Sequence, residues 1–307
     1  MEHKNNYLSR DGYSSLELEN KFNPIITSRD LTLSHSTFEK WRKFIYNNCG
    51  IYFQDNKKYL LESRLLKRLN TLHLDTYEDY LEYINVHSIK TVELKQLFEA
   101  ITINETYFFR NQPQFEELSK KILPEILSSK INSFNPKIRI WSAASSSGDE
   151  AYTTAILINE LVQPKFPGVT FEIIGSDINN EVLEKARNGV YKEYSVRNTP
   201  IYYLKKYFRR VGNEYLLDPN IIKMVKFEEL NLYDDLKMKL KQNFDVIFCS
   251  NVLIYFDTKS KIKVVNHLYN SMNQGAYLFI GYSETMHGIS NAFQLVSFPK
   301  TIAYKKT

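Results

Sequence analysis

The segment from Lys137 to Glu150 constrains the fold of this chain more than any other. A short apolar run that includes Ile138, Ile140 and Trp141 gives way to a run of small residues, and an acidic pair then opens a helical pattern. This order predicts a strand, a tight loop and a helix. In a parallel α/β sheet such a loop lies at the carboxyl edge, where ligands bind, and small side chains let a ligand approach the backbone. The sequence therefore predicts a parallel α/β fold with a compact ligand at this loop.

The next predicted strand, residues 171–177, narrows the class of ligand because it ends in the carboxylate of Asp177. An acid at this position can accept hydrogen bonds from ribose hydroxyls. The first loop has one glycine, Gly148, where a dinucleotide site would have Gly-x-Gly-x-x-Gly to hold a pyrophosphate. Asp149 and Glu150 would repel phosphate but suit an ammonium or a sulfonium, so S-adenosylmethionine fits and NAD or ATP do not. The alternative is that both acids only favour the helix dipole.

Four motifs in order identify a resemblance. They are Asn104–Arg110, Trp141–Tyr152, Gly175–Ile178 followed by Leu183, Ala186, Gly189 and Tyr191, and Phe244–Asp257. Together they resemble the chemotaxis receptor glutamate methyltransferases, the CheR family, and the resemblance runs from about Phe38 to Tyr304. It implies transfer of a methyl group from S-adenosylmethionine to glutamate side chains of a chemotaxis receptor, giving glutamate methyl esters and S-adenosylhomocysteine.

The resemblance also implies an architecture. The expected class is α/β, a Rossmann-like methyltransferase fold with a mostly parallel sheet and an antiparallel last strand, plus a small N-terminal all-α domain and an antiparallel β insertion. The expected parts are a polar, flexible tail at 1–33, the helical domain at 34–105, a linker helix at 106–137 and the methyltransferase domain at 138–307, with the insertion at 192–228.

Local patterns predict individual elements within these parts. Ser36 and Glu39 form a possible capping box for the first helix, and Thr76 with Asp79 marks the start of the third. Strands are expected near 138–142, 171–176, 224–228, 244–249, 276–281 and 301–305, because strands and helices alternate after residue 138. The end of the chain reads as a β-hairpin around Pro299.

Composition agrees with a cytoplasmic enzyme. The 307 residues can bury a large core, and no apolar run approaches the length of a membrane span. Two cysteines, Cys49 and Cys249, fit neither a disulfide framework nor a metal cluster, and we expect both to be reduced and buried. The 40 basic residues exceed the 35 acidic ones too slightly to imply nucleic acid. We expect a monomer that uses no metal.

The expected chemistry is a single displacement. An ionised glutamate carboxylate is already a nucleophile at pH 7, so the enzyme needs no general base and supplies positioning and removal of water. A guanidinium can hold a carboxylate by two hydrogen bonds, and a tyrosine hydroxyl can orient one oxygen. The resemblance places Arg110 and Tyr255 in these catalytic roles, with Arg110 shared between cofactor and substrate.

For the cofactor, the resemblance implicates Glu150 at the methionyl ammonium, Asp177 at the ribose, and a further set of contacts. That set is Asn104, Thr106, Arg110, Asn231, Leu232, Ser250 and Asn251. The alternative for Asn104 and Thr106 is a helix-capping turn, and for Asn231 an ordinary loop asparagine.

Two departures from the family pattern affect what is expected. Ser250 stands where the family usually has arginine, so cofactor affinity or turnover could be reduced. The insertion has only Gly212 where some members have a glycine-rich loop for a receptor tail peptide, so we predict no such tethering. Docking is instead expected at a basic strip, unless this strip is only a solvated helix face. The strip consists of Lys57, Lys58, Arg64, Lys67 and Arg68.

Two rival functions compete with this interpretation. A non-catalytic relative that binds S-adenosylmethionine or S-adenosylhomocysteine and acts through protein contacts is favoured only by Ser250, and Arg110 with Tyr255 argues against it. A DNA methyltransferase would need an Asp/Asn-Pro-Pro-aromatic motif after the fourth strand to engage an extruded base, and this chain has no proline there.

Overall fold

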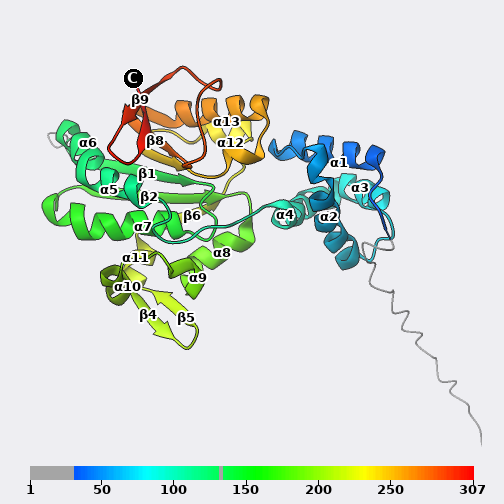
Figure 1. The fold of residues 1–307 in the computed structure, drawn as a ribbon, viewed down its shortest axis with the longest axis horizontal. Helices are drawn as coiled ribbons and strands as arrows, with labels where there is room; N and C mark the ends of the chain where they lie inside the picture. The colour runs from blue at the N-terminus through cyan, green and yellow to red at the C-terminus, as the bar shows by residue number, and fades with distance from the viewer. Residues whose placement is uncertain (1–30, 131–133) are drawn as a thin grey trace, which may run out of the picture.

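The structure is a computed structural model that describes residues 31–130 and 134–307. Most of the flexible tail expected at 1–33 lies outside the described residues. The described chain forms a helical domain, a large mixed sheet covered by helices on both faces, and a small antiparallel sheet (Figure 1). These are the parts of the predicted fold class.

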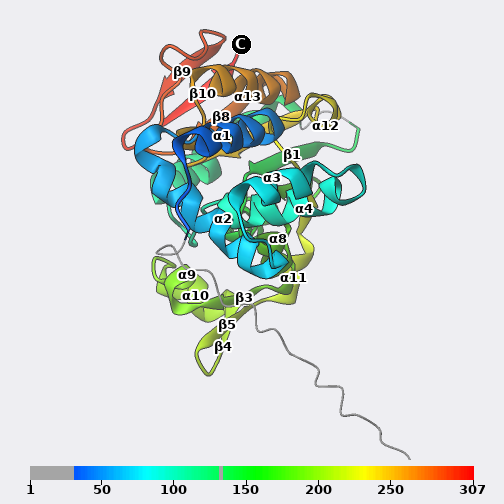
Figure 2. The ribbon, with the colours of Figure 1, turned by 90° about the vertical axis from the view of Figure 1, so that its right-hand side faces the viewer.

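Four helices make up the N-terminal domain, which faces the viewer in Figure 2. They are α1 (His35–Cys49), α2 (Lys58–Leu72), α3 (Tyr77–Asn85) and α4 (His87–Ile101). On α2, three fully buried leucines, Leu61, Leu65 and Leu69, recur every four residues and so face the core of this domain. They pack in one cluster with Trp41 and Tyr80.

Of the two helix N-caps expected from the sequence, one is present in the structure. The Ser36–Glu39 capping box is wrong, because Ser34 is the residue whose Oγ accepts a hydrogen bond from Thr37 N, at 3.1 Å. Ser36 therefore lies inside the first turn. At α3 the predicted cap is confirmed, since Thr76 and Asp79 each accept a hydrogen bond from the other's backbone N–H.

The large sheet has the strand order β6-β2-β1-β7-β8-β10-β9. Its first five strands in that order are parallel neighbours, and β10 pairs antiparallel with both β8 and β9. The strands are β1 (Lys137–Ala143), β2 (Thr170–Asp177), β6 (Val225–Glu229), β7 (Phe244–Cys249), β8 (Met272–Ile280), β9 (Phe293–Ser297) and β10 (Ile302–Lys306). The predicted parallel strands and the hairpin around Pro299 are confirmed.

Alternation along the strands sends side chains into two cores. On β1, Ile138 and Ile140 pack on one face, whereas Trp141 and Ala143 pack on the other. The first core includes residues of α5, α6 and α7, and the second includes residues of α12 and α13 (Figure 1). These helices are α5 (Gln112–Glu117), α6 (Leu123–Lys130), α7 (Asp149–Leu157), α12 (Asp235–Lys239) and α13 (Thr258–Ser271). Pro113 lies in the first turn of α5, where its missing N–H costs no intrahelical hydrogen bond.

The small sheet follows α8 (Asn180–Asn188) and has the strand order β3-β5-β4. Gly212, at a φ of +59°, lies in the turn between β4 and β5. The strand β6, at the end of the range 192–228 expected for the insertion, pairs with β2 and so belongs to the large sheet. The elements of this region are β3 (Val190–Lys192), α9 (Glu193–Val196), α10 (Ile201–Tyr207), β4 (Phe208–Val211), β5 (Glu214–Leu217) and α11 (Pro219–Lys223).

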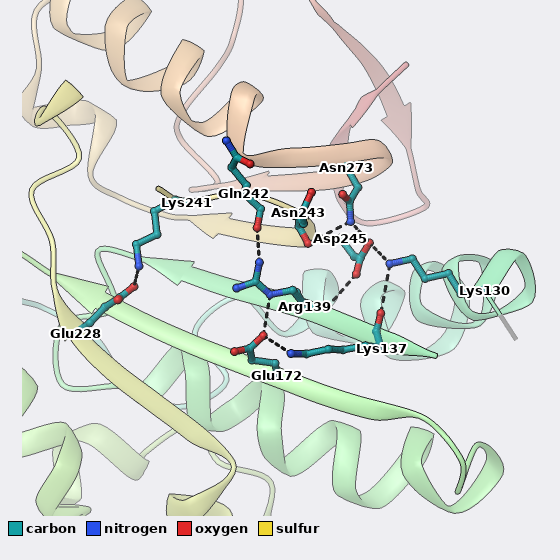
Figure 3. Close-up of polar contacts among 10 residues, drawn as sticks. All are labelled: Lys130, Lys137, Arg139, Glu172, Glu228, Lys241, Gln242, Asn243, Asp245 and Asn273. Carbon is teal, nitrogen blue, oxygen red and sulfur yellow. Dashed lines mark hydrogen bonds and ion pairs between the residues drawn. The ribbon is translucent and has the colours of Figure 1, made fainter. Parts of the chain in front are cut away.

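A polar network fastens the amino edge of the large sheet (Figure 3). The buried carboxylate of Asp245 accepts hydrogen bonds from Lys130 Nζ at 2.6 Å, Arg139 N at 2.9 Å and Asn273 Nδ2 at 2.7 Å. Arg139 also donates to Glu172 on β2, at 2.7 Å. These contacts join α6 to β1, β2, β7 and β8 at the edge opposite the carboxyl edge of the sheet.

Both cysteines are buried and free, as predicted. Across residues 31–130 and 134–307, none of the helices combines the length and hydrophobicity that crossing a lipid bilayer would take.

Candidate active site

The loop between β1 and α7 is tight and strongly constrained. Ala144, Ser146 and Gly148 all have positive φ, of +61°, +50° and +83°. A Cβ at Gly148 would lie 2.8 Å from Phe227 Cζ and 3.0 Å from Ala186 Cβ, so no other residue fits there without displacing a neighbour. The loop is thereby held against β2, where Ser145 N donates to Ser176 O at 2.8 Å.

A cavity of about 730 Å³ opens beside this loop at the carboxyl edge of the sheet. Its volume is in the range of small-molecule sites. All ten residues that the sequence assigned to cofactor binding or catalysis line it. They are Asn104, Thr106, Arg110, Glu150, Asp177, Asn231, Leu232, Ser250, Asn251 and Tyr255. Segments far apart in sequence therefore meet at one place, which sequence spacing alone did not establish.

Glu150, in the first turn of α7, presents a carboxylate to the cavity. Its Oε1 accepts a hydrogen bond from Ser142 Oγ at 2.8 Å. Burial raises the pKa of Glu150 to about 7, although Ser142, Ser250 and the positive charge of Arg110 lower it. A cationic ligand group beside this carboxylate would favour its ionised form, so the position suits an ammonium.

Asp177, at the end of β2, is buried and accepts two backbone hydrogen bonds. Ser146 N donates to its Oδ2 at 2.8 Å and Asn179 N donates to its Oδ1 at 3.0 Å. Burial raises the pKa of Asp177, and these backbone donors oppose that effect. The carboxylate thus fixes the loop of Ser146, and the remaining lone pairs of its oxygens can accept from a ribose diol.

Arg110 and Tyr255 come to the cavity from segments that are far apart in the sequence. Arg110 Nη1 donates to Glu105 O at 2.8 Å, and in the described residues its guanidinium forms no ion pair. Tyr255 is partly exposed, and burial raises the pKa of its phenol while Arg110 lowers it. The phenol is therefore neutral at pH 7, and a donor hydroxyl and a guanidinium face one cavity.

The segment before Arg110 is held by side-chain contacts of its own. Asn104 Nδ2 donates to Thr102 Oγ1 at 3.2 Å, and the Asn104 carbonyl accepts from Ser146 Oγ at 2.9 Å. No helix begins at these residues, since α4 ends at Ile101 and α5 begins at Gln112. The capping alternative for Asn104 and Thr106 is therefore wrong.

Asn231 has its side-chain amide engaged within the protein. Its Nδ2 donates to Asn48 O at 2.7 Å, and its Oδ1 accepts from Tyr233 N at 3.0 Å. The residue therefore ties the helical domain to the loop after β6, while Leu232 contributes a buried apolar wall.

The helical domain contributes a wall that sequence reasoning missed. Cys49, the last residue of α1, lines the cavity together with Ile51, Tyr52 and Phe53, although all four lie far before the first strand of the sheet in sequence. The available signal was Gly50, which ends α1 at a φ of +74° and redirects the chain. A second missed residue is Glu284, which lies just beyond the carboxyl end of β8.

The five residues of the expected basic strip, at the start of α2 and along it, are of two kinds. Arg64 donates to the backbone carbonyls of Ala100 and Thr102, and Arg68 forms an ion pair of 2.8 Å with the buried Glu93. Both guanidinium groups therefore join α2 to α4 and its end. The lysines differ, since Lys57 and Lys67 are exposed, Lys57 lines the cavity, and Lys58 lies 3.7 Å from Glu62.

The chemistry of the cavity fits S-adenosylmethionine. Two buried hydroxyls on its wall, Ser145 Oγ and Ser250 Oγ, lack a hydrogen bond of ordinary geometry in the described structure and could bond a polar ligand. Two carboxylates, Glu150 and Asp177, suit an ammonium and a ribose, and the apolar wall at Leu232 suits a flat base. In the described part of the chain, no cluster of three or more His, Cys, Asp or Glu side chains could hold a metal ion.

This chain is similar to known methyltransferases along most of its length. A family profile described as "CheR methyltransferase, SAM binding domain" matches residues 104–302, and one described as "CheR methyltransferase, all-alpha domain" matches residues 36–102. A "Chemotaxis protein methyltransferase" of Borreliella burgdorferi is 36% identical over 89% of this chain and 94% of its own length. "Chemotaxis protein methyltransferase 2" of Vibrio cholerae is 36% identical over 90% of this chain and 95% of its own length. "Chemotaxis protein methyltransferase 1" of Pseudomonas aeruginosa is 31% identical over 90% and 99%.

Proposed function

The chain belongs to the CheR methyltransferase family, and from that premise we propose that it methylates glutamate side chains of a chemotaxis receptor. The products are glutamate methyl esters and S-adenosylhomocysteine. One observation carries the proposal, namely that Arg110 and Tyr255 face the same cavity as Glu150 and Asp177. Two groups suited to a substrate carboxylate thus lie beside two groups suited to the cofactor.

When bound, S-adenosylmethionine supplies a methyl group on a positively charged sulfur. An oxygen of the ionised substrate glutamate forms a bond to the methyl carbon while the carbon–sulfur bond breaks. The carboxylate charge and the sulfonium charge cancel, so no proton has to move. The protein therefore has to position the two reactants and exclude water, and a general base is not needed.

We propose distinct roles for the residues around the cavity. Glu150 binds the methionyl ammonium, and Asp177 binds the ribose hydroxyls. Asn104, Thr106, Asn251 and Ser250 contact the rest of the cofactor. Asn231 acts through the wall it forms with Leu232, since its amide is already bonded to Asn48 and Tyr233.

Arg110 and Tyr255 are the proposed catalytic residues. Arg110 uses one nitrogen on Glu105 O, which leaves donors for the substrate carboxylate. Because a full ion pair would weaken the nucleophile, this grip is shared between substrate and cofactor. Tyr255 keeps its proton at pH 7 and can donate to one carboxylate oxygen.

The proposed partner is the helical, acidic methylation region of a chemoreceptor, met in the cytoplasm by a monomeric enzyme. The exposed Lys67 and the half-exposed Lys58 on α2 support docking at the helical domain, together with Lys57 at the cavity mouth. Arg64 and Arg68 support the proposal less, since their guanidinium groups bond within the domain. Absence of tail-peptide tethering stays a prediction.

The test begins with calorimetric titration of S-adenosylmethionine and S-adenosylhomocysteine into the purified protein. Methyl transfer is then measured with methyl-labelled S-adenosylmethionine and a cytoplasmic chemoreceptor fragment. Carboxyl methyl esters release volatile labelled methanol in mild alkali, whereas methylated amines and amides do not. A fragment whose candidate glutamates are changed to glutamine is the control.

Labelled methanol from the first fragment and none from the second is the expected result. Binding of both ligands without any transfer would instead favour the non-catalytic relative. That alternative is not favoured at present, because Arg110 and Tyr255 are both in place in the cavity.

A further inference from the structure

Glu284 lies just past the carboxyl end of β8 and binds the backbone of a different loop. Its Oε2 accepts hydrogen bonds from Asn251 N at 2.8 Å and from Gly281 N at 2.7 Å, and its Oε1 accepts from Ile254 N at 3.2 Å. One carboxylate therefore satisfies three backbone donors. Two of them belong to the loop that follows β7, whose residues Ser250, Asn251, Val252, Ile254 and Tyr255 line the cavity.

The loop after β7 leaves the sheet through a left-handed residue. Asn251 has a φ of +61°, a conformation that is uncommon outside glycine but that asparagine tolerates better than most residues. The short 3₁₀ turn Leu253–Tyr255 follows directly and carries the proposed catalytic tyrosine. Because Glu284 binds the backbone on both sides of Val252, it fixes the direction in which this turn leaves the sheet.

The packing between the two loops leaves no spare room. A Cβ at Gly281 would lie 2.6 Å from Glu284 Oε2 and 2.9 Å from Asn251 N. Only glycine therefore lets β8 end close enough for the carboxylate to reach the neighbouring loop. Among the described residues, those that line the cavity do not include Glu284, so the structure connects it to the cavity through the loop that it binds.

We propose that Glu284 is a positioning residue for methyl transfer, which acts by holding the backbone of the 250–255 loop so that the Tyr255 hydroxyl faces the cavity. The inference rests on the proposed function, because it assigns Tyr255 to the substrate. The carboxylate suits the role since charge-assisted hydrogen bonds to backbone N–H groups are stronger than neutral ones. Displacement of a reacting group by about 1 Å can cost roughly 100-fold in rate.

The kinetic test is a double-mutant cycle between Glu284→Ala and Tyr255→Phe, read as kcat for methylation of the receptor fragment. We expect Glu284→Ala to lower kcat by roughly 10–100-fold. In the Tyr255→Phe background, Glu284→Ala should lower kcat by less than about threefold, because the hydroxyl that Glu284 positions is already absent. The proposal would be overturned if the two single-variant reductions in kcat multiplied in the double variant. It would also be overturned if the kcat of Glu284→Ala stayed within about threefold of the wild type.

Two further variants guard against a loss of fold. Glu284→Gln keeps one acceptor oxygen and should recover part of the lost kcat. Asp79→Ala is the matched control, because Asp79 also caps a backbone N–H but lies in the helical domain. It should leave kcat unchanged, and a comparable fall in kcat would mean that the Glu284 effect is a general loss of stability.

Amide hydrogen exchange separates failure of this inference from failure of the proposed function. In Glu284→Ala the amides of Asn251 and Ile254 should exchange at least about tenfold faster, while the amide of Phe108, which bonds Ser195 O elsewhere, should not change. If the wild type transfers no methyl group, the proposed function fails and this measurement alone judges the positioning. Unchanged exchange at Asn251 and Ile254 would refute it.

Discussion

The backbone N–H of Tyr52 donates a hydrogen bond to the carbonyl oxygen of Tyr255, at 3.0 Å. Next to it, Ile51 and Phe256 form an antiparallel β-bridge. The helical domain is thus joined through the backbone to the proposed catalytic loop, whose earlier residues Asn251 and Ile254 are bound by Glu284. Under the proposed docking at the helical domain, this junction would place the substrate glutamate relative to Tyr255.

Gly50 makes this junction possible, and replacing it tests the junction. Gly50→Ala would put a Cβ 2.5 Å from Tyr233 Cδ2 at a φ of +74°. Strain and overpacking together should lower the free energy of unfolding by about 2–4 kcal/mol, measured in urea. Gly212→Ala is the control, since Gly212 has a φ of +59° and no neighbour within 4 Å, and should cost about 1 kcal/mol. Equal losses would mean that contact with Tyr233 is unimportant.

Asp177→Asn should weaken binding of S-adenosylhomocysteine by roughly 10–100-fold, because an amide replaces a carboxylate that bonds Ser146 N, Asn179 N and the proposed ribose. The measurement is calorimetric titration. Asp245→Asn is the matched control, since Asp245 is also buried and accepts several hydrogen bonds but lies at the opposite edge of the sheet. It should destabilise the fold without changing affinity, and equal losses of affinity would refute a specific role for Asp177.

Glu150 should make cofactor affinity depend on pH. Folding raises the pKa of this carboxyl from 4.5 to about 7, so below that pH the apo protein holds a proton that an ammonium must displace. Affinity for S-adenosylhomocysteine should therefore fall about tenfold between pH 8 and pH 6. In Glu150→Gln this fall should disappear, with weaker binding at pH 8. Because titration of the ligand's own amino group is common to both proteins, parallel pH profiles would exclude Glu150 as the group.

Sequence patterns predicted this fold well where the determinants are local. Alternating strands and helices, the loop before Asp149 and the acid at Asp177 all depend on residues within one βαβ unit, so they could be inferred from order alone. That Asn104, Arg110 and Tyr255 share one site was predicted only from the family resemblance, because no spacing rule relates residues so far apart in the sequence.

The sequence was least informative where packing selects between equivalent residues. Ser34 and Ser36 are both plausible caps, and the helix start decides for Ser34. In the sequence, Glu284 looks like an ordinary acidic residue of a loop. Its role becomes visible only in the structure, where β8 lies beside β7. Likewise, Arg68 shares α2 with exposed lysines, and only the position of α4 shows that its charge is paired with Glu93.

The difference between the paired Arg68 and the exposed Lys67 on α2 yields a prediction about stability. Arg68 and Glu93 have side chains only 13% and 5% exposed, and Tyr80 also donates to Glu93 at 2.7 Å. Arg68→Ala would leave that carboxylate without its cation and should cost about 3 kcal/mol of unfolding free energy. Lys67→Ala, the neighbouring control, should change stability by less than about 0.5 kcal/mol.

Receptor docking, in contrast to stability, should depend on the lysines of α2. Reversing Lys58 and Lys67 to glutamate should raise the KM for the receptor fragment severalfold and leave titration with S-adenosylhomocysteine unchanged, because neither lysine lines the cavity in the described structure. The wild-type KM should also rise with salt, as exposed charges are screened beyond about 10 Å at 0.1 M. If the KM for the receptor fragment changed neither on charge reversal nor with salt, the receptor would have to approach over a different surface, such as the mouth of the cavity beside Tyr255.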